Sequence, residues 1–597
     1  MDCVVCHFND AKPRRKLGST VLLTAILAFS ILTVSSSLGN ELTSASVAYA
    51  QTTKQLTLAP ELKTIPNSGP APPTSNFNLP SGYTIEPVAW NLTLPGPMTA
   101  DDKGNLYLAI VGYAYGQIKS TPMILKIDPS GNTAILVDRF LFEPISDIKF
   151  NKNNGLIYVS HRAIISTVDP TTGVVKDLVI GLPQVDSGSH PQGQIAFGPD
   201  GRVYFTTGTA TNSGVADKSD LAFGWLKVMP QMHDVPGQDV NLVGQNFESK
   251  DLLHPQNKGN VTTGAFVAFG TSTSPGQVVK GNATCTGCLL SINPDGSDLS
   301  LHAWGLRSPF GMALDGDNNK LYITNNGADD KGIRPITNDT DNVYTFDLSS
   351  VSTASTTGNM TASDTAPTAR NNSSSLIWYG WPDFYGNGEP VTDAKFGMSK
   401  NLTHAHQFLI QNHPEVTKPF TQLDVGPGVT QLAYINSTAF IQTPSILAGE
   451  FGIAVPINHD IRVNGKIIGQ KIVSINPVDG NVTDFLSLKE PDTSFRPVAL
   501  AFNDKENALY ISSIGKVEIK TTTDKGGNLP MPVVWPYPLT GVIWKITHTG
   551  GAETATATTV SNQTSISNAT GMTTSNETTT TTTTAGPTGL IPGMPGT

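Results

Sequence analysis

The sequence predicts an all-β fold made of short hairpins that repeat along the chain. One phrase, a polar turn followed by a short strand of alternating apolar residues, has five plain copies and one weaker copy. The plain copies lie at residues 101–109, 151–160, 198–206, 315–324 and 503–512, and the weaker copy lies near residues 430–442. Alternation over so few residues, bounded by Gly, Asn and Asp, is typical of β-hairpins.

A second phrase, a strand that usually ends in an Asn-Pro or Asp-Pro turn, lies between copies of the first. It is found at residues 124–131, 290–296 and 472–480, with shorter versions at 165–170 and 542–546. Two hairpin phrases per unit make a four-stranded sheet, and such sheets repeated around one axis make a β-propeller. Six copies predict a six-bladed β-propeller. We expect residues 76–79 and 541–547 to complete one blade together.

The N-terminal end of the chain differs in composition from the middle. Residues 14–16 are Arg, Arg and Lys, an apolar run follows at 21–34, and an Ala-Tyr-Ala sequence ends at Ala50. That order predicts a secretory signal peptide over residues 1–50, with an uncleaved membrane anchor as the alternative. We assign residues 51–75 to a linker and residues 76–549 to the propeller domain.

Residues 550–597 are nearly all small or polar, with many threonines and no aromatic residue. Such a segment cannot bury enough apolar surface to offset the entropy of ordering it, so we predict a disordered Thr-rich tail. The composition is typical of a glycosylated stalk, which could tether the protein to a cell surface. Sequons of the form Asn-x-Thr agree with export, and they lie at Asn91, Asn260, Asn282, Asn401, Asn481, Asn562, Asn568 and Asn576. We therefore expect a secreted or cell-surface glycoprotein.

Charge and cysteine content narrow the classes of function. The formal net charge of −10 argues against a nucleic-acid partner, whose phosphates require a basic face. Of the four cysteines, only Cys285 and Cys288 lie outside the predicted signal peptide. Outside the cell this Cys-x-x-Cys pair is expected to form a local disulfide, with a redox-active thiol pair as the alternative.

Three strands of the predicted propeller are preceded by side chains suited to proton and anion chemistry. His190 stands before one strand, Arg307 holds the same place before another, and Arg496 repeats the placement in the last blade. Strand entrances of different blades surround one axis, so these side chains can meet. A histidine base beside guanidinium groups suits the oxidation of an alcohol, in which a proton leaves while an anion forms. The alternative is that all three are structural and that the arginines bond backbone carbonyls.

Four motifs, in this order along the body, resemble the soluble glucose/sorbosone dehydrogenase family. They are the histidine segment at residues 190–201, Gly-Leu-Arg-Ser-Pro-Phe-Gly at 305–311, Trp-Tyr-Gly-Trp-Pro at 378–382 and Arg-Pro at 496–497. The resemblance implies a six-bladed propeller that uses pyrroloquinoline quinone (PQQ) with calcium. The polar loop at residues 209–214, which leaves the histidine blade, is then expected at the rim of the pocket.

The resemblance also implies roles for individual residues. His190 matches the base that removes the proton from the anomeric hydroxyl of the sugar, after which hydride passes to the quinone. Arg307 matches the group that stabilises the developing oxyanion charge. Gly327 and Ala328 lie where backbone carbonyls bind the calcium ion, for which such hard oxygen ligands are suited.

Two further arginines match partners of the cofactor's carboxylates. Arg496 corresponds to one of them, and Arg462 is a looser candidate for another. Arginine suits this role because it pairs with carboxylates through two parallel hydrogen bonds. An external electron acceptor is expected, because the chain has no Cys-x-x-Cys-His motif for haem attachment.

The chain departs from the family pattern at several places. Ser189, Ser308 and Ser494 stand where the family often has Asp, Asn and Arg, and Ala328 replaces Pro. These departures predict an altered or weakened cofactor pocket, whereas the four motifs predict a PQQ-dependent dehydrogenase that oxidises an aldose or a sorbosone-like aldehyde. The alternative is a catalytically inactive surface propeller that binds glycans or proteins, since a fold does not fix a function.

Overall fold

The structure is a computed structural model, and it describes eleven stretches of the chain. These are residues 67–114, 118–183, 190, 193–223, 225–350, 376–397, 405–452, 462–463, 466–492, 494–522 and 531–549. The predicted signal peptide, most of the linker and the predicted tail lie outside them. Nearly all regular structure in these stretches is antiparallel β-sheet, which confirms the predicted all-β class. No helix in the described part of the chain is long and apolar enough to cross a membrane.

Among the described residues, six sheets have four or five strands each, and we number them by chain order. The first contains β3 (Pro95–Ala100), β4 (Leu106–Ile110), β7 (Met123–Ile127) and β8 (Thr133–Val137). The second contains β9 (Ile145–Asn151), β10 (Leu156–His161), β11 (Ile164–Val168) and β12 (Val175–Ile180). The third contains β13 (Ile195–Phe197), β14 (Val203–Thr206), β19 (Cys288–Ile292), β20 (Ser300–Trp304) and β24 (Ile377–Trp378).

The other three sheets follow the same plan. The fourth contains β21 (Ser308–Asp315), β22 (Lys320–Asn326), β23 (Asn342–Asp347) and β28 (Thr421–Gln422). The fifth contains β29 (Val429–Ile435), β30 (Ser445–Glu450), β33 (Lys471–Ile475), β34 (Val482–Leu488) and β1 (Phe77–Asn78). The sixth contains β35 (Pro497–Asn503), β36 (Ala508–Ser513), β39 (Gly541–His548) and β2 (Tyr83–Leu92). All six predicted hairpin copies lie at the start of these sheets.

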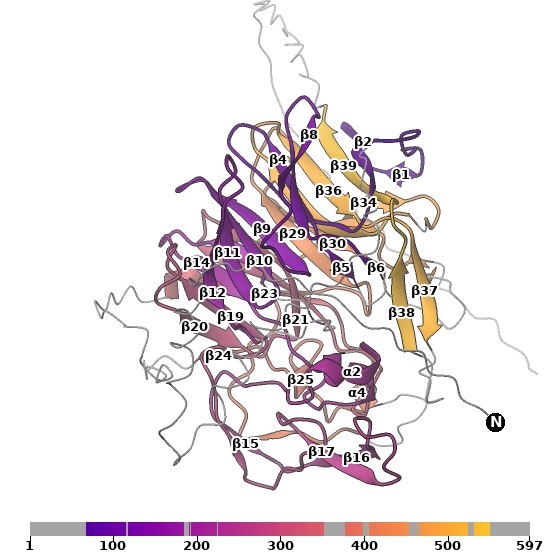
Figure 1. The fold of residues 1–597 in the computed structure, drawn as a ribbon. Helices are drawn as coiled ribbons and strands as arrows, with labels where there is room; N and C mark the ends of the chain where they lie inside the picture. The colour runs from indigo at the N-terminus through magenta and orange to yellow at the C-terminus, as the bar shows by residue number, and fades with distance from the viewer. Residues whose placement is uncertain are drawn as a thin grey trace, which may run out of the picture. The chain divides into compact units, whose positions relative to one another are not determined.

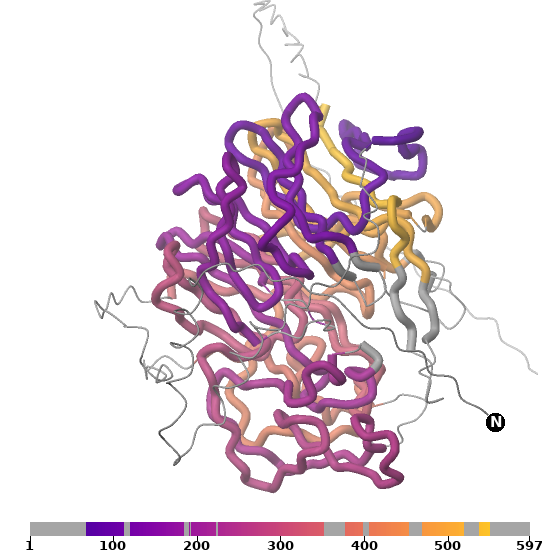
Figure 2. Tube along the Cα trace, in the orientation of Figure 1, coloured from indigo at the N-terminus to yellow at the C-terminus, as the bar shows by residue number. Residues whose placement is uncertain are grey.

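The sheets are arranged so that their first strands form a closed ring. β3 contacts β9, β9 contacts β13, β13 contacts β21, β21 contacts β29, β29 contacts β35, and β35 contacts β3. The hydrophobic core lies between neighbouring sheets, as where Leu108 of the first sheet and Ile543 of the sixth share one buried cluster. Complete burial of one such side chain contributes about 1.5–3 kcal/mol. Figure 2 follows the chain through the sheets from indigo to yellow.

The ends of the described chain close the ring differently from the prediction. β2 pairs antiparallel with β39, so residues 83–92 complete the sixth sheet, and the two strands lie side by side in Figure 1. Residues 77–78 instead pair with β34 of the fifth sheet, so the expectation for residues 76–79 is wrong. The ring of Phe77 meets those of Phe495 and Trp544 edge-on at 5.1 and 4.9 Å, so β1 packs against β39 of the sixth sheet while its backbone pairs with the fifth.

The centre of the ring is filled by polar side chains from three sheets. Nε2 of Gln431 donates a hydrogen bond to Oδ1 of Asp147 at 2.7 Å and another to Oε1 of Gln194 at 3.3 Å. All three residues are almost completely buried. Burial raises the pKa of Asp147, although Lys149 and the hydrogen bonds that the carboxyl accepts act against it. This contact joins the second and fifth sheets directly across the axis.

Two insertions build a small layer beside the ring, seen in the lower part of Figure 1. The first lies between β14 and β19 and contains α2 (Lys218–Phe223), α3 (Trp225–Val228), β15 (Val240–Leu242), β16 (Asn246–Lys250), β17 (Asn260–Gly264) and β18 (Val278–Val279). The second contains β25 (Phe384–Tyr385), β26 (Glu389–Pro390), α4 (Ala394–Gly397) and β27 (Ile410–Gln411). β15 pairs with both β18 and β27, so the two insertions join in one sheet.

The remaining elements are short and peripheral to the six sheets. They are β5 (Tyr113–Ala114), β6 (Ile118–Lys119), η1 (Leu348–Ser350), β31 (Arg462–Val463), β32 (Lys466–Ile467), β37 (Val517–Thr522) and β38 (Met531–Pro536). Apart from η1, they are strands of two or six residues that pair as hairpins, β5 with β6, β31 with β32 and β37 with β38.

Candidate functional site

His190 is buried just before β13 and is held in one orientation. The exposed fraction of the whole residue is 3%. Nδ1 lies 2.9 Å from the carbonyl oxygen of Thr209 and 2.8 Å from the Thr209 hydroxyl, which itself donates to the carbonyl of Thr211. A carbonyl oxygen only accepts, so Nδ1 carries the ring proton and Nε2 carries the lone pair. The imidazole is therefore set up as a base at Nε2.

The surroundings of His190 keep it neutral. Burial lowers its pKa well below 6.5, and the positive charges of Arg307 and Lys331 lower the pKa further. Asp329 and the hydrogen bond to Thr209 act in the opposite direction and are outweighed. A base that stays unprotonated at neutral pH is ready to accept a proton.

Arg307 lies next to His190, and its guanidinium is saturated by acceptors of the chain itself. Nε donates to the Asn212 carbonyl at 3.1 Å, and Nη2 donates to Asn212 Oδ1 at 2.6 Å and to Asp329 Oδ2 at 2.8 Å. Nη1 donates to the carbonyls of Asn326 and Gly327. Each N–H direction of the group thus has a partner. Arg307 bonds backbone carbonyls, as the structural alternative expected, while its charge still faces the histidine.

Asp329 and Lys331 extend this cluster, and Lys331 was not identified from the sequence. Lys331 Nζ lies 2.7 Å from Asp329 Oδ2, the same oxygen that Arg307 contacts. Desolvation beside the buried cluster acts to raise the pKa of Asp329, but Lys331 and Arg307 outweigh it and hold that pKa well below its ordinary value. The two cations and one carboxylate give the cluster a net charge of about +1 next to His190.

Gly327 and Ala328 do not fit a calcium site in this arrangement. The Gly327 carbonyl accepts a hydrogen bond from Arg307, so a divalent cation there would compete with a guanidinium for the same oxygen. The nearby carboxylates of Asp341 and Asp339 accept from the amides of Gly327 and Ala328, at 2.9 and 2.6 Å. The described stretches hold no group of three or more His, Cys, Asp or Glu side chains placed to bind a metal ion.

Arg496 has the chemistry of an anion-binding group. It is 5% exposed, and its Nη1 donates to the carbonyls of Phe451 and Gly452 at 3.1 and 3.2 Å. Its Nε is buried without a hydrogen-bond partner. Burial lowers the pKa of Arg496 to about 10, against the attraction of Asp492. A buried guanidinium with an unused donor fits a carboxylate ligand, because an unsatisfied buried donor is costly.

Arg462 and the cysteine pair add little to the candidate site. Arg462 lies in β31, and its side chain is outside what the structure describes. Cys285 and Cys288 form a disulfide, and both residues are completely buried. Their complete burial disfavours the redox-active alternative, which requires an accessible thiolate.

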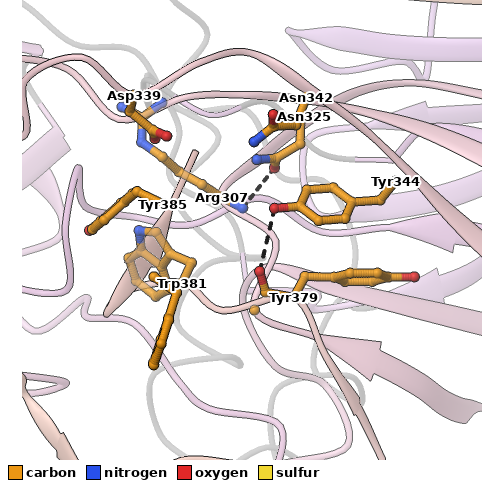
Figure 3. Close-up of a pocket in the computed structure, with 10 residues that line it drawn as sticks. Arg307, Asn325, Asp339, Asn342, Tyr344, Tyr379, Trp381 and Tyr385 are labelled. Carbon is orange, nitrogen blue, oxygen red and sulfur yellow. Dashed lines mark hydrogen bonds between the residues drawn. The ribbon is translucent and has the colours of Figure 1, made fainter. Parts of the chain in front are cut away.

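A cavity adjoins Arg307 on its inner side (Figure 3). Its volume is about 10 Å³, enough for about one water molecule and far below the roughly 300–1,000 Å³ of an ordinary ligand pocket. Aromatic rings form much of the wall, and the Tyr344 hydroxyl donates to the Tyr379 carbonyl across it. The lining residues are Gly305, Arg307, Asn325, Asp339, Asn342, Tyr344, Tyr379, Trp381, Phe384 and Tyr385. This cavity is therefore too small to hold a sugar or an organic cofactor.

Comparison with known proteins gave no family model and no curated protein that matches the chain. Solved structures similar to it include PQQ-dependent sugar dehydrogenases. The holo PQQ domain of a pyranose dehydrogenase from Coprinopsis cinerea has a TM-score of 0.46 and 14% identity, covering 81% of this chain and 99% of that one. A PQQ-bound aldose sugar dehydrogenase from Streptomyces coelicolor has a TM-score of 0.39 and 14% identity, covering 79% and 100%. A Trichoderma reesei structure from carbohydrate-active enzyme family AA12 has a TM-score of 0.45 and 14% identity, covering 79% and 98%.

The structure thus brings together some of the predicted residues and separates others. His190, Arg307 and Gly327 lie in one connected cluster. No contact of the described residues links Arg496 to that cluster. Thr209 and Asn212, which bond His190 and Arg307, were noted in the sequence only as part of a polar loop.

Proposed function

We propose that the chain is a sugar dehydrogenase with His190 as its general base and PQQ as its hydride acceptor. The observation that carries the proposal is a buried, neutral imidazole with its proton fixed on Nδ1, beside a cluster of net positive charge. The ordered motifs at residues 190–201, 305–311, 378–382 and 496–497 support the choice of substrate and cofactor. We infer that the six sheets are the six blades of a propeller, whose strand entrances form the site.

Oxidation of a sugar hydroxyl removes one proton and one hydride from the same C–OH group. Nε2 of His190 accepts the proton, and the charges of Arg307 and Lys331 favour the oxygen as it becomes negative. Arg496 would pair with a carboxylate of PQQ through its guanidinium. When bound, PQQ supplies the two-electron acceptor for the hydride. Calcium has no part in these steps, since its expected carbonyl is bonded to Arg307.

The proposal also covers where the protein works. The basic, apolar and small-residue order at the N-terminus supports export, and the Thr-rich C-terminal segment supports a surface tether. The substrate class is an aldose or a related aldehyde, and the electrons leave to an external acceptor. The lack of a haem attachment motif supports the external acceptor.

The test uses the purified full chain with PQQ and a panel of aldoses. We expect PQQ to bind, seen as a change in its absorption spectrum, and a redox dye to be reduced with at least one sugar. His190→Ala should retain binding and lower kcat by about 10²- to 10⁴-fold. The control is His254→Ala. It removes an exposed histidine whose ring contacts Asp251, and it should leave kcat unchanged.

Other outcomes contradict specific parts of the proposal. Absence of PQQ binding would remove the quinone as cofactor. Binding of sugars without turnover would instead support the glycan-binding alternative. Turnover that survives in His190→Ala would remove His190 as the base.

A further inference from the structure

The loop at residues 209–214 is completely buried, so its predicted place at a pocket rim is wrong. The second insertion and the segment between β22 and β23 cover it, since Trp381 Nε1 donates to the Asn212 carbonyl and Arg334 Nη1 donates to the Ser213 carbonyl. Loops normally run over the surface, because buried backbone polar groups must each find a partner. A buried loop with this many hydrogen bonds to other segments is therefore a rigid part of the structure.

Asp234 is the anchor of this loop. It is 1% exposed, and its Oδ1 accepts from the Ala210 amide at 2.7 Å. Its Oδ2 accepts from the Thr211 amide at 3.1 Å and from the Thr211 hydroxyl at 2.5 Å. Three donors on two consecutive residues thus converge on one carboxylate. Charge-assisted hydrogen bonds of this kind are about twice as strong as neutral ones.

The anchored loop contacts both members of the proposed site. At one end, the Thr209 carbonyl accepts from Nδ1 of His190, and the Thr209 amide donates to the Arg307 carbonyl at 2.9 Å. Three residues later, Asn212 accepts from Nε and Nη2 of Arg307. Asn212 also accepts from the Asp329 amide and donates to the Asp329 carbonyl, both at 2.9 Å. One short loop therefore sets the position of the base and of the cation beside it.

We propose that Asp234 is a positioning residue that keeps Nε2 the basic nitrogen of His190, acting through the Thr209–Thr211 backbone. By fixing the Ala210 and Thr211 amides, the carboxylate holds the Thr209 carbonyl where it accepts the Nδ1 proton. Without that acceptor the proton can move to Nε2, which then cannot take a proton from a substrate. The catalytic consequence rests on the proposed function, whereas the tautomer of His190 does not.

The sharpest perturbation is Asp234→Asn. Asparagine keeps the shape of the side chain but offers one acceptor oxygen and one amide group, which has donors only. Its amide group must face at least one of the Ala210 or Thr211 N–H groups, and two donors repel each other. The loop then shifts, and the Thr209 carbonyl moves away from Nδ1. The matched control is Asp315→Asn, another fully buried aspartate that accepts two backbone amides and one side-chain donor, in the turn between β21 and β22.

The primary readout is the ¹⁵N NMR spectrum of histidine-labelled protein, in which His190→Gln identifies the His190 signals. We expect the wild-type protein and Asp315→Asn to show the Nδ1–H tautomer, and Asp234→Asn to show a substantial Nε2–H population. In the dye-reduction assay, Asp234→Asn should lower kcat by about 10- to 100-fold with KM changed less than about twofold. Thr209→Val keeps the carbonyl and should retain the wild-type tautomer.

The other possible results of these experiments each support or contradict the positioning role of Asp234. If His190 keeps the Nδ1–H tautomer in a folded Asp234→Asn protein, the proposal is wrong. If Asp234→Asn does not fold, Thr211→Val replaces it, because it removes one of the three donors and keeps the side-chain shape. A tautomer shift there supports the proposal, and an unchanged spectrum contradicts it. A tautomer shift in a protein that oxidises no sugar would support the positioning role and contradict the proposed function.

Discussion

Glu450, at the end of β30, gives a quantitative prediction of how stability depends on pH. The residue is 2% exposed, and its Oε2 has no hydrogen-bond partner. Its closest positive charge is Lys471 on the neighbouring strand, at 3.7 Å from Oε2. Burial raises the pKa of Glu450 from 4.5 to about 7, since the attraction of Lys471 only partly offsets the burial and nearby carboxylates add to it.

The sign of the effect follows from the direction of this shift. The folded protein binds the Glu450 proton more tightly than the unfolded chain, so this site favours folding at low pH. That advantage is lost as the pH rises from about 4.5 to about 7. One pKa unit corresponds to about 1.4 kcal/mol, so a shift of about 2.5 units costs the folded state about 3 kcal/mol above pH 7. Glu450→Gln removes the ionisation and should remove most of this cost.

Urea unfolding of both proteins at pH 5 and pH 8.5 measures the difference. We expect Glu450→Gln to match the wild type within about 1 kcal/mol at pH 5 and to exceed it by about 1–3 kcal/mol at pH 8.5. The gain in stability is expected near 1 kcal/mol if Glu450→Gln also removes a favourable interaction of Lys471. Lys471 then keeps its ion pair with Asp484, at 2.9 Å. The control is Glu389→Gln, which removes a partly exposed carboxylate bonded to Lys395. Parallel pH dependence in Glu450→Gln and the wild type would refute the reasoning.

Four further predictions concern the site and the closure of the ring. Because burial and Arg307 lower the pKa of His190, the acid limb of kcat/KM against pH should fall below pH 6.5, and a limb above that value would contradict the neutral imidazole. Asn212→Ala removes four hydrogen bonds of its side chain and should lower stability by about 2–4 kcal/mol and kcat by at least tenfold; thermal unfolding and dye reduction measure the two effects. Phe77→Ala should lower stability by about 2–4 kcal/mol because it removes the packing of the ring against Phe495 and Trp544, with calorimetry as the assay. Replacing Cys285 and Cys288 by Ser should cost only about 2 kcal/mol in urea unfolding, because the loop that the disulfide closes is short.

The sequence predicts the sheets well because each hairpin carries its own signal. Polar turns followed by alternating strands depend on residues that are neighbours in the chain, and all six copies are found as paired strands. The closure of the ring carries no such local signal. It depends on how Phe77 pairs with β34 while its ring packs against Phe495 and Trp544, which is a matter of contacts between distant segments.

The candidate site shows the same division between local and distant information. His190 and Arg307 were predicted because each precedes the first strand of a repeated hairpin, and the ring brings those positions together. Thr209, Asn212 and Asp234 have no recognisable pattern of their own. Their roles appear only once residues of other segments, such as Trp381 and Arg334, bury the loop at residues 209–214, because its polar groups then need partners inside the protein.

The charges of Arg307, Lys331 and Asp329 act both on the protonation of His190 and on the charge of any oxygen nearby. Burial is the main reason that the pKa of His190 is low, and the positive charges of Arg307 and Lys331 lower this pKa further because they oppose a proton on the imidazole. The same field favours a negative charge on an oxygen that lies closer to the cations than the imidazole does. Because the N–H groups of Arg307 already have acceptors in the chain, the proposed function has Arg307 act through this field and not through a new hydrogen bond. In that proposal Asn212 and Asp329 fix where the positive charge lies.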